Sequence, residues 1–300
     1  MIFIFKKGLI WIFFIFFVTQ TVWAEKVYFR LDQSKIRLNI PPGNSQAGTI
    51  IIHSQSDEEI NLQVYLEDWE YTDKQDGTKH FFPAQSTLRS CAEWIKFSPA
   101  EFTLPAWGEK RLNYIVSIPQ DATGGRYAVM FFQTLLSQPT QTQTSEYLSD
   151  GEIRSGVNLA IRIGTLFYVE AEGTIERRAE LKNLSVSADG KDKPLSISVD
   201  LLNAGNVDIT AGGTFNIIDK QGSVYARGEF NEVGTFSGDV AKLTSSWTKP
   251  LPEGIYDLIL TINLGKTIEV KRPGTIPVIT QEAEIVIDAQ GKVISIGQLR

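Results

Sequence analysis

The residues able to carry catalytic or metal-binding chemistry are few and scattered. His53 and His80 are the only imidazoles, and Cys91 is the only thiol. Neither histidine has a serine or cysteine nearby in a recognisable nucleophile motif, which argues against a hydrolytic triad. A zinc site needs about four Cys or His ligands, or three and a water. The sequence therefore predicts no metal and no cofactor, and it predicts a buried, inert Cys91.

Carboxylates suited to glycoside cleavage are represented best by Asp68 and Glu70, which alternate with Trp69 and Tyr71. Side chains alternate across a strand, so we expect both carboxylates on a wet face and both rings on a buried face. No phosphate-binding glycine loop or dinucleotide fingerprint is present in the sequence. We therefore expect a protein that is not an enzyme.

The composition describes a folded, mildly acidic chain. Of its 300 residues 42% are apolar and 21% are charged, which suits a buried core and excludes a collagen-like or wholly disordered protein. Twenty-nine Lys and Arg against 35 Asp and Glu give a net charge of -6. Phosphate contacts need a basic face, so we expect no nucleic-acid partner.

The N-terminus carries the pattern of a secretory signal. Lys6 and Lys7 precede an apolar stretch of ten residues, Leu9–Val18, and polar residues follow before Ala24. This pattern predicts a signal peptide over residues 1–24, with cleavage after Ala24 and a periplasmic, extracellular or cell-surface location. The alternative is a membrane anchor, although a spanning helix needs about 20 apolar residues.

Beyond the signal the chain has the pattern of an all-β protein. Short β-branched or alternating runs recur between turn residues, and no segment shows apolar residues at helical spacing. The predicted strands are Lys35–Ile40, Gly48–His53, Ile60–Trp69, Lys110–Ile118, Tyr127–Leu136, Val157–Val169, Leu181–Ser187, Leu195–Leu202, Gly213–Ile218, Ser223–Glu229, Val240–Trp247, Tyr256–Asn263 and Glu282–Ile287.

A repeated corner divides these strands into two similar halves. A proline, then a glycine, then Tyr127 lead into an apolar strand, and the same pattern recurs at Tyr256. In immunoglobulin-like sandwiches such a tyrosine hydrogen-bonds back to the preceding loop, which we expect of both residues. The alternative is a chance recurrence of turn residues. We predict two tandem immunoglobulin-like β-sandwiches, residues 25–172 and 173–300, with a polar loop at Ser137–Gly156.

Several motifs of the first half together resemble one family. They are Leu31-Asp32 with Ser34–Leu38, Trp94–Pro99 with Leu104–Gly108, the corner from Pro119 to Phe131, the polar loop, and Leu166-Phe167-Tyr168. These motifs resemble the PapD-like periplasmic chaperones of pilus assembly. The chain is also similar to tandem immunoglobulin-like surface proteins that accompany WxL proteins, in Gly164–Val169 and Leu202–Val207.

The resemblance implies binding of secreted or pilus-type surface subunits by strand donation. The last strand of the first sandwich would lend alternating apolar residues to an incomplete subunit, and two basic residues would hold the subunit's terminal carboxylate. The residues that match the apolar positions are Val157, Leu159, Ile161 and Ile163. Lys35, with Arg37 on the same face, matches the first basic position, whereas Thr165 stands at the second.

Each of these residues also has a simpler interpretation. The four apolar residues fit the inward face of an ordinary sandwich strand. Lys35 and Arg37 fit solvated edge charges that discourage sheet pairing. A different function, a surface module that binds cell-wall polymer or glycan, would use an aromatic platform made of Trp69, Tyr71, Phe81, Phe82 and Trp107.

Overall fold

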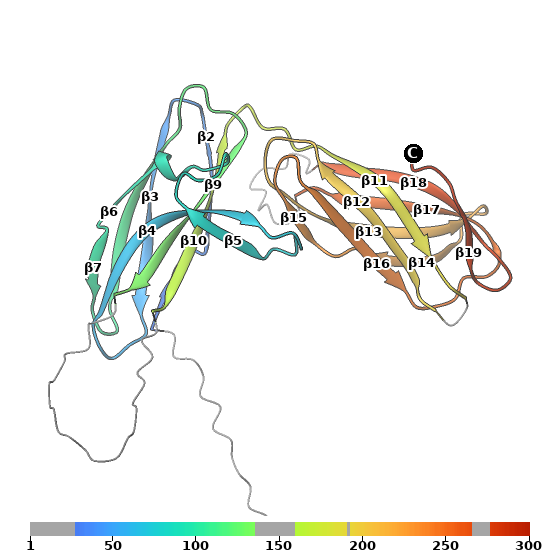
Figure 1. Ribbon diagram of the computed structural model, residues 1–300, viewed down its shortest axis with the longest axis horizontal. Coiled ribbons are helices and arrows are strands. Elements are labelled where there is room, and N and C mark those ends of the chain that lie inside the picture. Colours follow the sequence, from blue (N-terminus) through green and yellow to red (C-terminus); the bar gives the residue numbers. More distant parts are fainter. Residues whose placement is uncertain (1–27, 136–159, 191–192, 266–276) are drawn as a thin grey trace, which may run out of the picture.

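The computed structural model describes residues 28–135, 160–190, 193–265 and 277–300, and almost all of its regular structure is strand (Figure 1). The described residues hold no helix that is long and apolar enough to cross a membrane. The predicted signal at 1–24 lies outside them. The elements are β1 (Phe29–Leu31), β2 (Lys35–Ile40), β3 (Ser45–Ser54), β4 (Ile60–Tyr71), β5 (Lys79–Pro83), the 3-10 turn η1 (Ala92–Trp94), β6 (Ile95–Ser98), β7 (Glu101–Leu104), β8 (Glu109–Ser117), β9 (Gly125–Thr134), β10 (Arg162–Ala171), β11 (Ala179–Ser187), β12 (Leu195–Asn203), β13 (Ile209–Asp219), β14 (Val224–Glu229), β15 (Val233–Thr235), β16 (Val240–Trp247), β17 (Gly254–Asn263), β18 (Val278–Ile287) and β19 (Val293–Ile296).

The first ten strands form one sandwich. Its smaller sheet has the order β1-β3-β8-β6, and its larger sheet has the order β2-β10-β9-β4-β5 with β7 on β4. The chain leaves β1 in the smaller sheet and crosses to β2 in the larger one, where β2 runs parallel to β10. Alternating apolar residues of both sheets, such as Ile50, Leu112, Met130 and Phe167, form its core. Such a core is what period-two strands produce when two sheets face each other.

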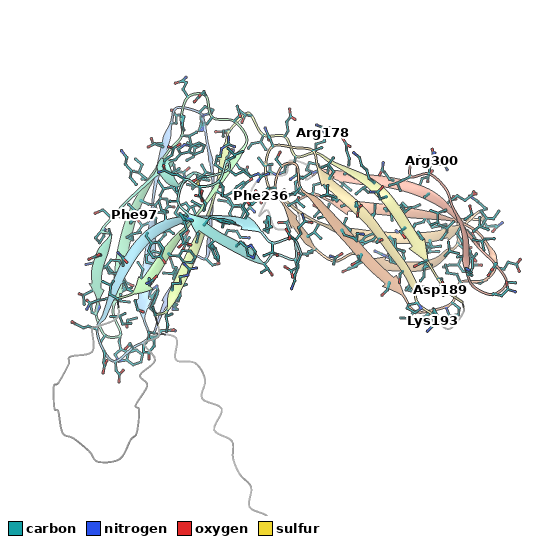
Figure 2. The ribbon with its side chains drawn as sticks, viewed as in Figure 1. Phe97, Arg178, Asp189, Lys193, Phe236 and Arg300 are labelled. Carbon is teal, nitrogen blue, oxygen red and sulfur yellow. The ribbon has the colours of Figure 1, made fainter. Side chains whose placement is uncertain are left out.

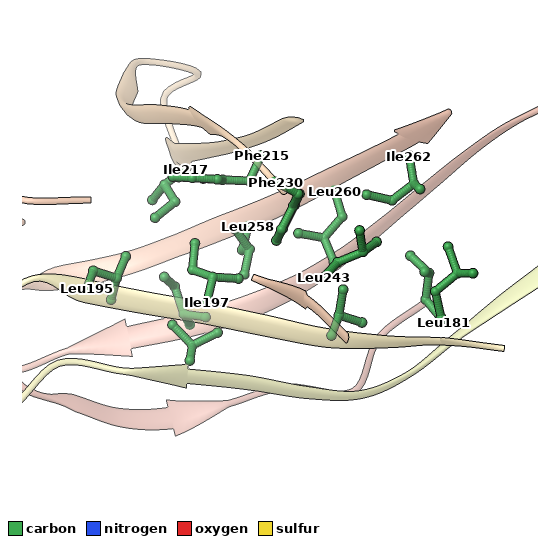
Figure 3. Close-up of a cluster of buried hydrophobic side chains, with 14 of the residues drawn as sticks. Leu181, Leu195, Ile197, Phe215, Ile217, Phe230, Leu243, Leu258, Leu260 and Ile262 are labelled. Carbon is green, nitrogen blue, oxygen red and sulfur yellow. The ribbon is translucent and has the colours of Figure 1, made fainter. Parts of the chain in front are cut away.

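The remaining strands form a second sandwich. A three-stranded sheet, β11-β12-β16, faces a larger sheet of order β14-β13-β17-β18-β19 in which β15 also pairs with β13. Its core packs side chains such as Ile197, Phe215, Leu243 and Leu258 between the two sheets (Figure 3). The prediction of two tandem sandwiches is confirmed, whereas the boundary between residues 172 and 173 remains a prediction.

The strands that sequence predicted are the long central ones. β2 and β16 have the predicted bounds, but β10 begins at Arg162, and residues 157–159 lie outside the described part. The strands without a prediction are β1, β5, β6, β7, β15 and β19. They hold three to five residues each, which is too short for an alternating pattern to stand out.

Tyr256 makes the predicted tyrosine corner, and its hydroxyl donates to the backbone oxygen of Pro252 at 2.9 Å. We expect Tyr256→Phe to lower the free energy of unfolding by about 1 kcal/mol, because one buried hydrogen bond is lost. Urea unfolding measures this change. The control is Tyr225→Phe on exposed Tyr225, whose ring packs against Tyr256. Equal unfolding midpoints for the two variants would contradict the role assigned to the corner.

Candidate functional site

Among the described residues, one flank of β10 has no paired strand where β10 begins. β9 pairs with β10 without a register shift. On the other flank β2 pairs only from Leu166, which lies opposite Lys35. The N–H of Leu166 bonds toward the β2 side, and bonding direction alternates along an antiparallel strand, so the N–H groups of Arg162 and Gly164 face this same flank. We call Arg162–Thr165 the open edge.

The predicted apolar stripe is described only in part. Val157 and Leu159 lie outside the described residues. Ile161 and Ile163 are half-buried and pack against the core of the first sandwich, as the interpretation of an inward strand face expects. Thr165 continues this inward face, and its hydroxyl donates to the backbone oxygen of Gln33 at 2.7 Å. The position where the resemblance places a second basic residue is therefore filled by a buried hydroxyl.

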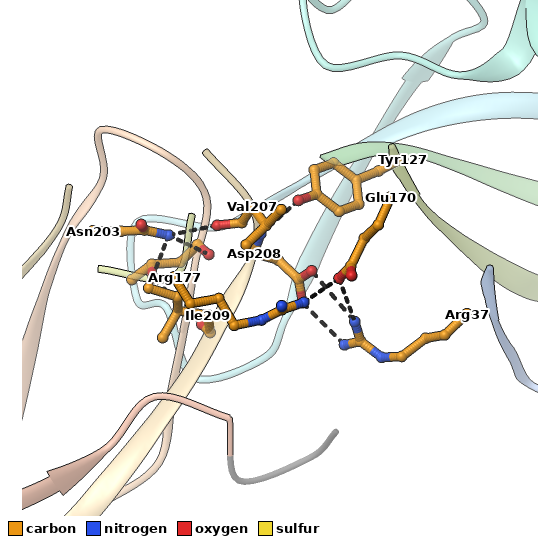
Figure 4. Close-up of polar contacts among 9 residues, drawn as sticks. Arg37, Tyr127, Glu170, Arg177, Asn203, Val207, Asp208 and Ile209 are labelled. Carbon is orange, nitrogen blue, oxygen red and sulfur yellow. Dashed lines mark hydrogen bonds and ion pairs between the residues drawn. The ribbon is translucent and has the colours of Figure 1, made fainter. Parts of the chain in front are cut away.

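The two predicted basic residues share one face of β2 but have different partners. The Lys35 Nζ lies 5.2 Å from the ring centroid of Tyr168, and the Arg37 guanidinium lies 4.0 Å from it. Arg37 also donates to both carboxylate oxygens of Asp208 in the second sandwich, at 2.9 and 3.3 Å (Figure 4). Arg37 is therefore not a solvated edge charge. Lys35 has no carboxylate within 4.0 Å among the described residues.

Asp208 anchors the contact between the sandwiches, which we call the junction. Its side chain is 1% exposed, and its backbone N–H donates to the hydroxyl of Tyr127 at 2.6 Å. The prediction that Tyr127 bonds back to its own preceding loop is wrong, because its hydroxyl accepts this N–H from the other sandwich. Next to it Glu170 pairs with both Arg37 and Arg177. The carboxylates of Asp208 and Glu170 are thus paired with guanidinium groups, which compensate their charges.

Aromatic rings fill the rest of the junction. Phe236, which follows β15 in the second sandwich, lies 5.0 Å from Trp69, 4.9 Å from Tyr71 and 4.3 Å from Tyr127, measured between ring centroids. Figure 2 shows Phe236 between the two sandwiches. Burial is the largest cause that raises the pKa of Tyr168, the ring under Lys35, to about 12. Sequence reasoning missed Phe236, because nothing in its local pattern distinguishes it from a core residue.

The predicted sugar-binding platform is not assembled. Trp69 is 1% exposed and belongs to the junction. Trp107 is 71% exposed, but its backbone N–H donates to the backbone oxygen of Ser56, ahead of β4, whereas Trp69 lies in the second half of β4. The two rings therefore lie toward opposite ends of one strand.

The burial of Asp68 differs from what was predicted, whereas the burial of Cys91 agrees with its prediction. Asp68 is fully buried rather than wet, and its carboxylate accepts bonds from the N–H and hydroxyl of Thr87 and from the hydroxyl of Ser90. These bonds fix the chain that follows β5. Cys91 is buried, and this burial raises its thiol pKa well above the ordinary value. Glu70 pairs with Arg89 at 3.3 Å, so the two carboxylates have separate structural partners.

These features define a two-sandwich protein with an open strand edge beside a basic and aromatic junction. No family model matches the chain, and no curated protein matches it. The solved structures to which the chain is similar include fimbrial chaperones. A chain from a chaperone–tip adhesin complex of CFA/I fimbriae biogenesis is 12% identical, with a TM-score of 0.48 over 85% of this chain and 98% of that one.

Two further structures show the same likeness. The class 5 fimbriae chaperone CfaA is 12% identical, with a TM-score of 0.47 over 85% of this chain and 98% of its own. The E. coli chaperone DraB is 12% identical, with a TM-score of 0.40 over 90% of this chain and 95% of its own. At this level of identity the likeness concerns the fold alone.

Proposed function

We propose that this chain is an exported, non-enzymatic, chaperone-like protein of the periplasm that binds secreted or pilus-type surface subunits by strand donation. The observation that supports this is the open edge of β10, whose main-chain groups on one flank face no strand within residues 28–135 and 160–190. A partner strand would gain affinity from these groups and register from alternate side chains. Ile161 and Ile163, continued by Val157 and Leu159, would supply those side chains.

The open edge of β10 also favours one direction for the partner segment. This edge ends where the chain crosses from β1 to β2. There the backbone oxygen of Ser34 accepts the N–H of Leu166, and the pairing of β2 with β10 begins at Lys35. A segment parallel to β10 would end there with its carboxyl terminus against the Lys35 ammonium. An antiparallel segment would instead bring an amino terminus to that cation. Like charges repel, so we propose the parallel direction.

Co-purification of surface subunits with the tagged chain, from the organism that naturally makes it, tests the role of these side chains. Ile161→Glu places a carboxylate on the apolar stripe, and we expect recovery of surface subunits with the tagged full chain to fall about tenfold or more. The matched control is Ile115→Glu, since Ile115 is 40% exposed on β8 in the other sheet. Urea unfolding identifies any variant that fails to fold. Unchanged recovery with a folded Ile161→Glu protein would contradict strand donation.

A main-chain variant tests the same edge independently. Arg162→Pro removes an N–H that faces the open flank and leaves the bonds to β9 intact. Arg162→Ala is its control, because both variants lose the 3.0 Å ion pair with Glu67. Strand donation predicts weaker partner recovery for the proline variant alone. Equal recovery for the two variants would mean that this N–H is not used.

A further inference from the structure

The open edge contains one residue without a side chain, Gly164, and an aromatic ring fills the space above it. Phe131 of β9 lies directly opposite Gly164 in the pairing of the two strands. A Cβ on Gly164 would lie 2.9 Å from Cε1 of Phe131 and 2.7 Å from Cγ2 of Val129. Non-bonded carbon atoms prefer about 3.5–4.0 Å. The Phe131 ring therefore occupies the place of the missing side chain, as in the aromatic rescue of an edge glycine.

Neighbouring side chains hold the Phe131 ring in this position. The guanidinium of Arg162 lies over the ring, 4.2 Å from its centroid. Phe81 and Tyr65 lie 5.0 and 5.8 Å from it, measured between ring centroids. The Cδ1–Cε1 edge of the ring is the part that lies over Gly164. This edge is therefore fixed next to the open flank before any segment binds.

A segment added to the open flank would bring one side chain to this ring edge. Adjacent strands lie about 4.8 Å apart, and directly paired residues point to the same face of a sheet. The segment residue opposite Gly164 would thus share the face of Phe131, with no Cβ of residue 164 between them. A ring edge is electropositive and a ring face is electronegative, so an aromatic residue at this place gains an edge-to-face contact.

We propose that Gly164 and Phe131 form a notch that selects an aromatic residue in the bound segment. This inference rests on the proposed function and adds a specificity determinant to it. The apolar stripe recognises the side of the segment that shares the inward face of β10, whereas the notch recognises the opposite side. The fitting partner is a strand with apolar residues on one face and an aromatic residue on the other.

Peptides blocked at both ends test the notch without any contribution from terminal charges. The parent is an N-acetylated, C-amidated peptide of alternating valine and threonine, and one central threonine is replaced by phenylalanine or by cyclohexylalanine. Calorimetric titration into the full chain measures each affinity. We expect the phenylalanine peptide to bind about tenfold more tightly than the parent and about threefold more tightly than the cyclohexylalanine peptide, which lacks an aromatic face.

Gly164→Ala fills the notch and keeps the backbone N–H groups of the open edge. We expect this variant to abolish the preference for phenylalanine and to bind the parent peptide within about twofold of wild type. Gly228→Ala is the matched control, because Gly228 of β14 lies opposite Phe215 and its Cβ would lie 2.5 Å from Cε1 of that ring. This control should keep the preference, and urea unfolding identifies a variant that fails to fold.

NMR of the wild-type chain locates the peptide ring without any variant. Leu166 lies two residues after Gly164 on β10 and packs against the cluster that contains Phe131. We expect nuclear Overhauser effects between the phenylalanine ring of the peptide and the methyl groups of Leu166. The methyl groups of Ile115, which is 40% exposed on β8 of the other sheet, should show none.

The outcomes separate the notch from strand donation. If the three peptides bind equally well, strand donation stands and the notch is wrong. If cyclohexylalanine binds as tightly as phenylalanine, or if Gly164→Ala keeps the preference, selection of an aromatic face by this notch is wrong. If none of the peptides binds, strand donation to such segments is wrong, and the notch is refuted with it.

Discussion

Phe236→Ala is expected to lower the free energy of unfolding by about 3–5 kcal/mol, the usual cost of emptying a buried phenylalanine site. The ring is 1% exposed and contacts Trp69, Tyr71 and Tyr127 across the junction. Removal leaves a cavity between two separately built sandwiches, which cannot close it by repacking one core. We therefore also expect a wider range of angles between the sandwiches, measured as a larger radius of gyration by small-angle X-ray scattering.

Phe230→Ala provides the matched control for Phe236→Ala. Phe230 is also buried, but it packs within the core of the second sandwich and against Phe215. We expect it to lose comparable stability in urea and to keep the wild-type scattering profile. If Phe236→Ala behaves in the same way, the aromatic contact does not set the angle, and the polar contacts of the junction suffice.

Arg37→Met is expected to destabilise the protein by up to about 3–5 kcal/mol, the cost of leaving one buried charge without its partner. The Asp208 carboxylate is 1% exposed and depends on the Arg37 fork for compensation. The full figure is an upper limit, because the Arg37 side chain is 22% exposed and water reaches part of it. Urea unfolding of the full chain measures the change.

A double-mutant cycle isolates the Arg37–Asp208 pair. Arg37→Met combined with Asp208→Leu removes both charges, and apolar groups replace them. We expect this double variant to be more stable than the sum of the single changes by about 1–3 kcal/mol. Additive losses would show that the two side chains act independently. Every variant of this cycle keeps the hydrogen bond to the Tyr127 hydroxyl, because its donor is the backbone N–H of residue 208.

The class of fold could be predicted because strand patterns are local. β2 and the first half of β4 alternate apolar and polar residues, and their apolar positions are the buried ones. The corner at Tyr256 could also be predicted, since the hydroxyl and its acceptor are four residues apart. The same reasoning failed for Tyr127, whose partner Asp208 is 81 residues further along the chain.

The strands of the candidate site could be predicted from the sequence, whereas the partners of its charged side chains could not. Lys35 and the stripe of β10 follow from alternation and from the family resemblance. Lys79 was not predicted, because it lies on β5, one of the short strands without an alternating pattern, and its place over Trp69 and Tyr71 depends on the pairing of β5 with β4.

By itself the sequence determined that this chain forms strands, that these strands pack as two sandwiches, and that catalytic and metal-binding residues are sparse. Period-two patterns and residue types carry that information within a few neighbouring positions. Only the tertiary structure decided that Arg37 pairs with Asp208 and that Phe236 joins the two sandwiches. Whether a charged side chain has an oppositely charged partner depends on contacts between segments that are distant in the sequence, as between Arg37 and Asp208.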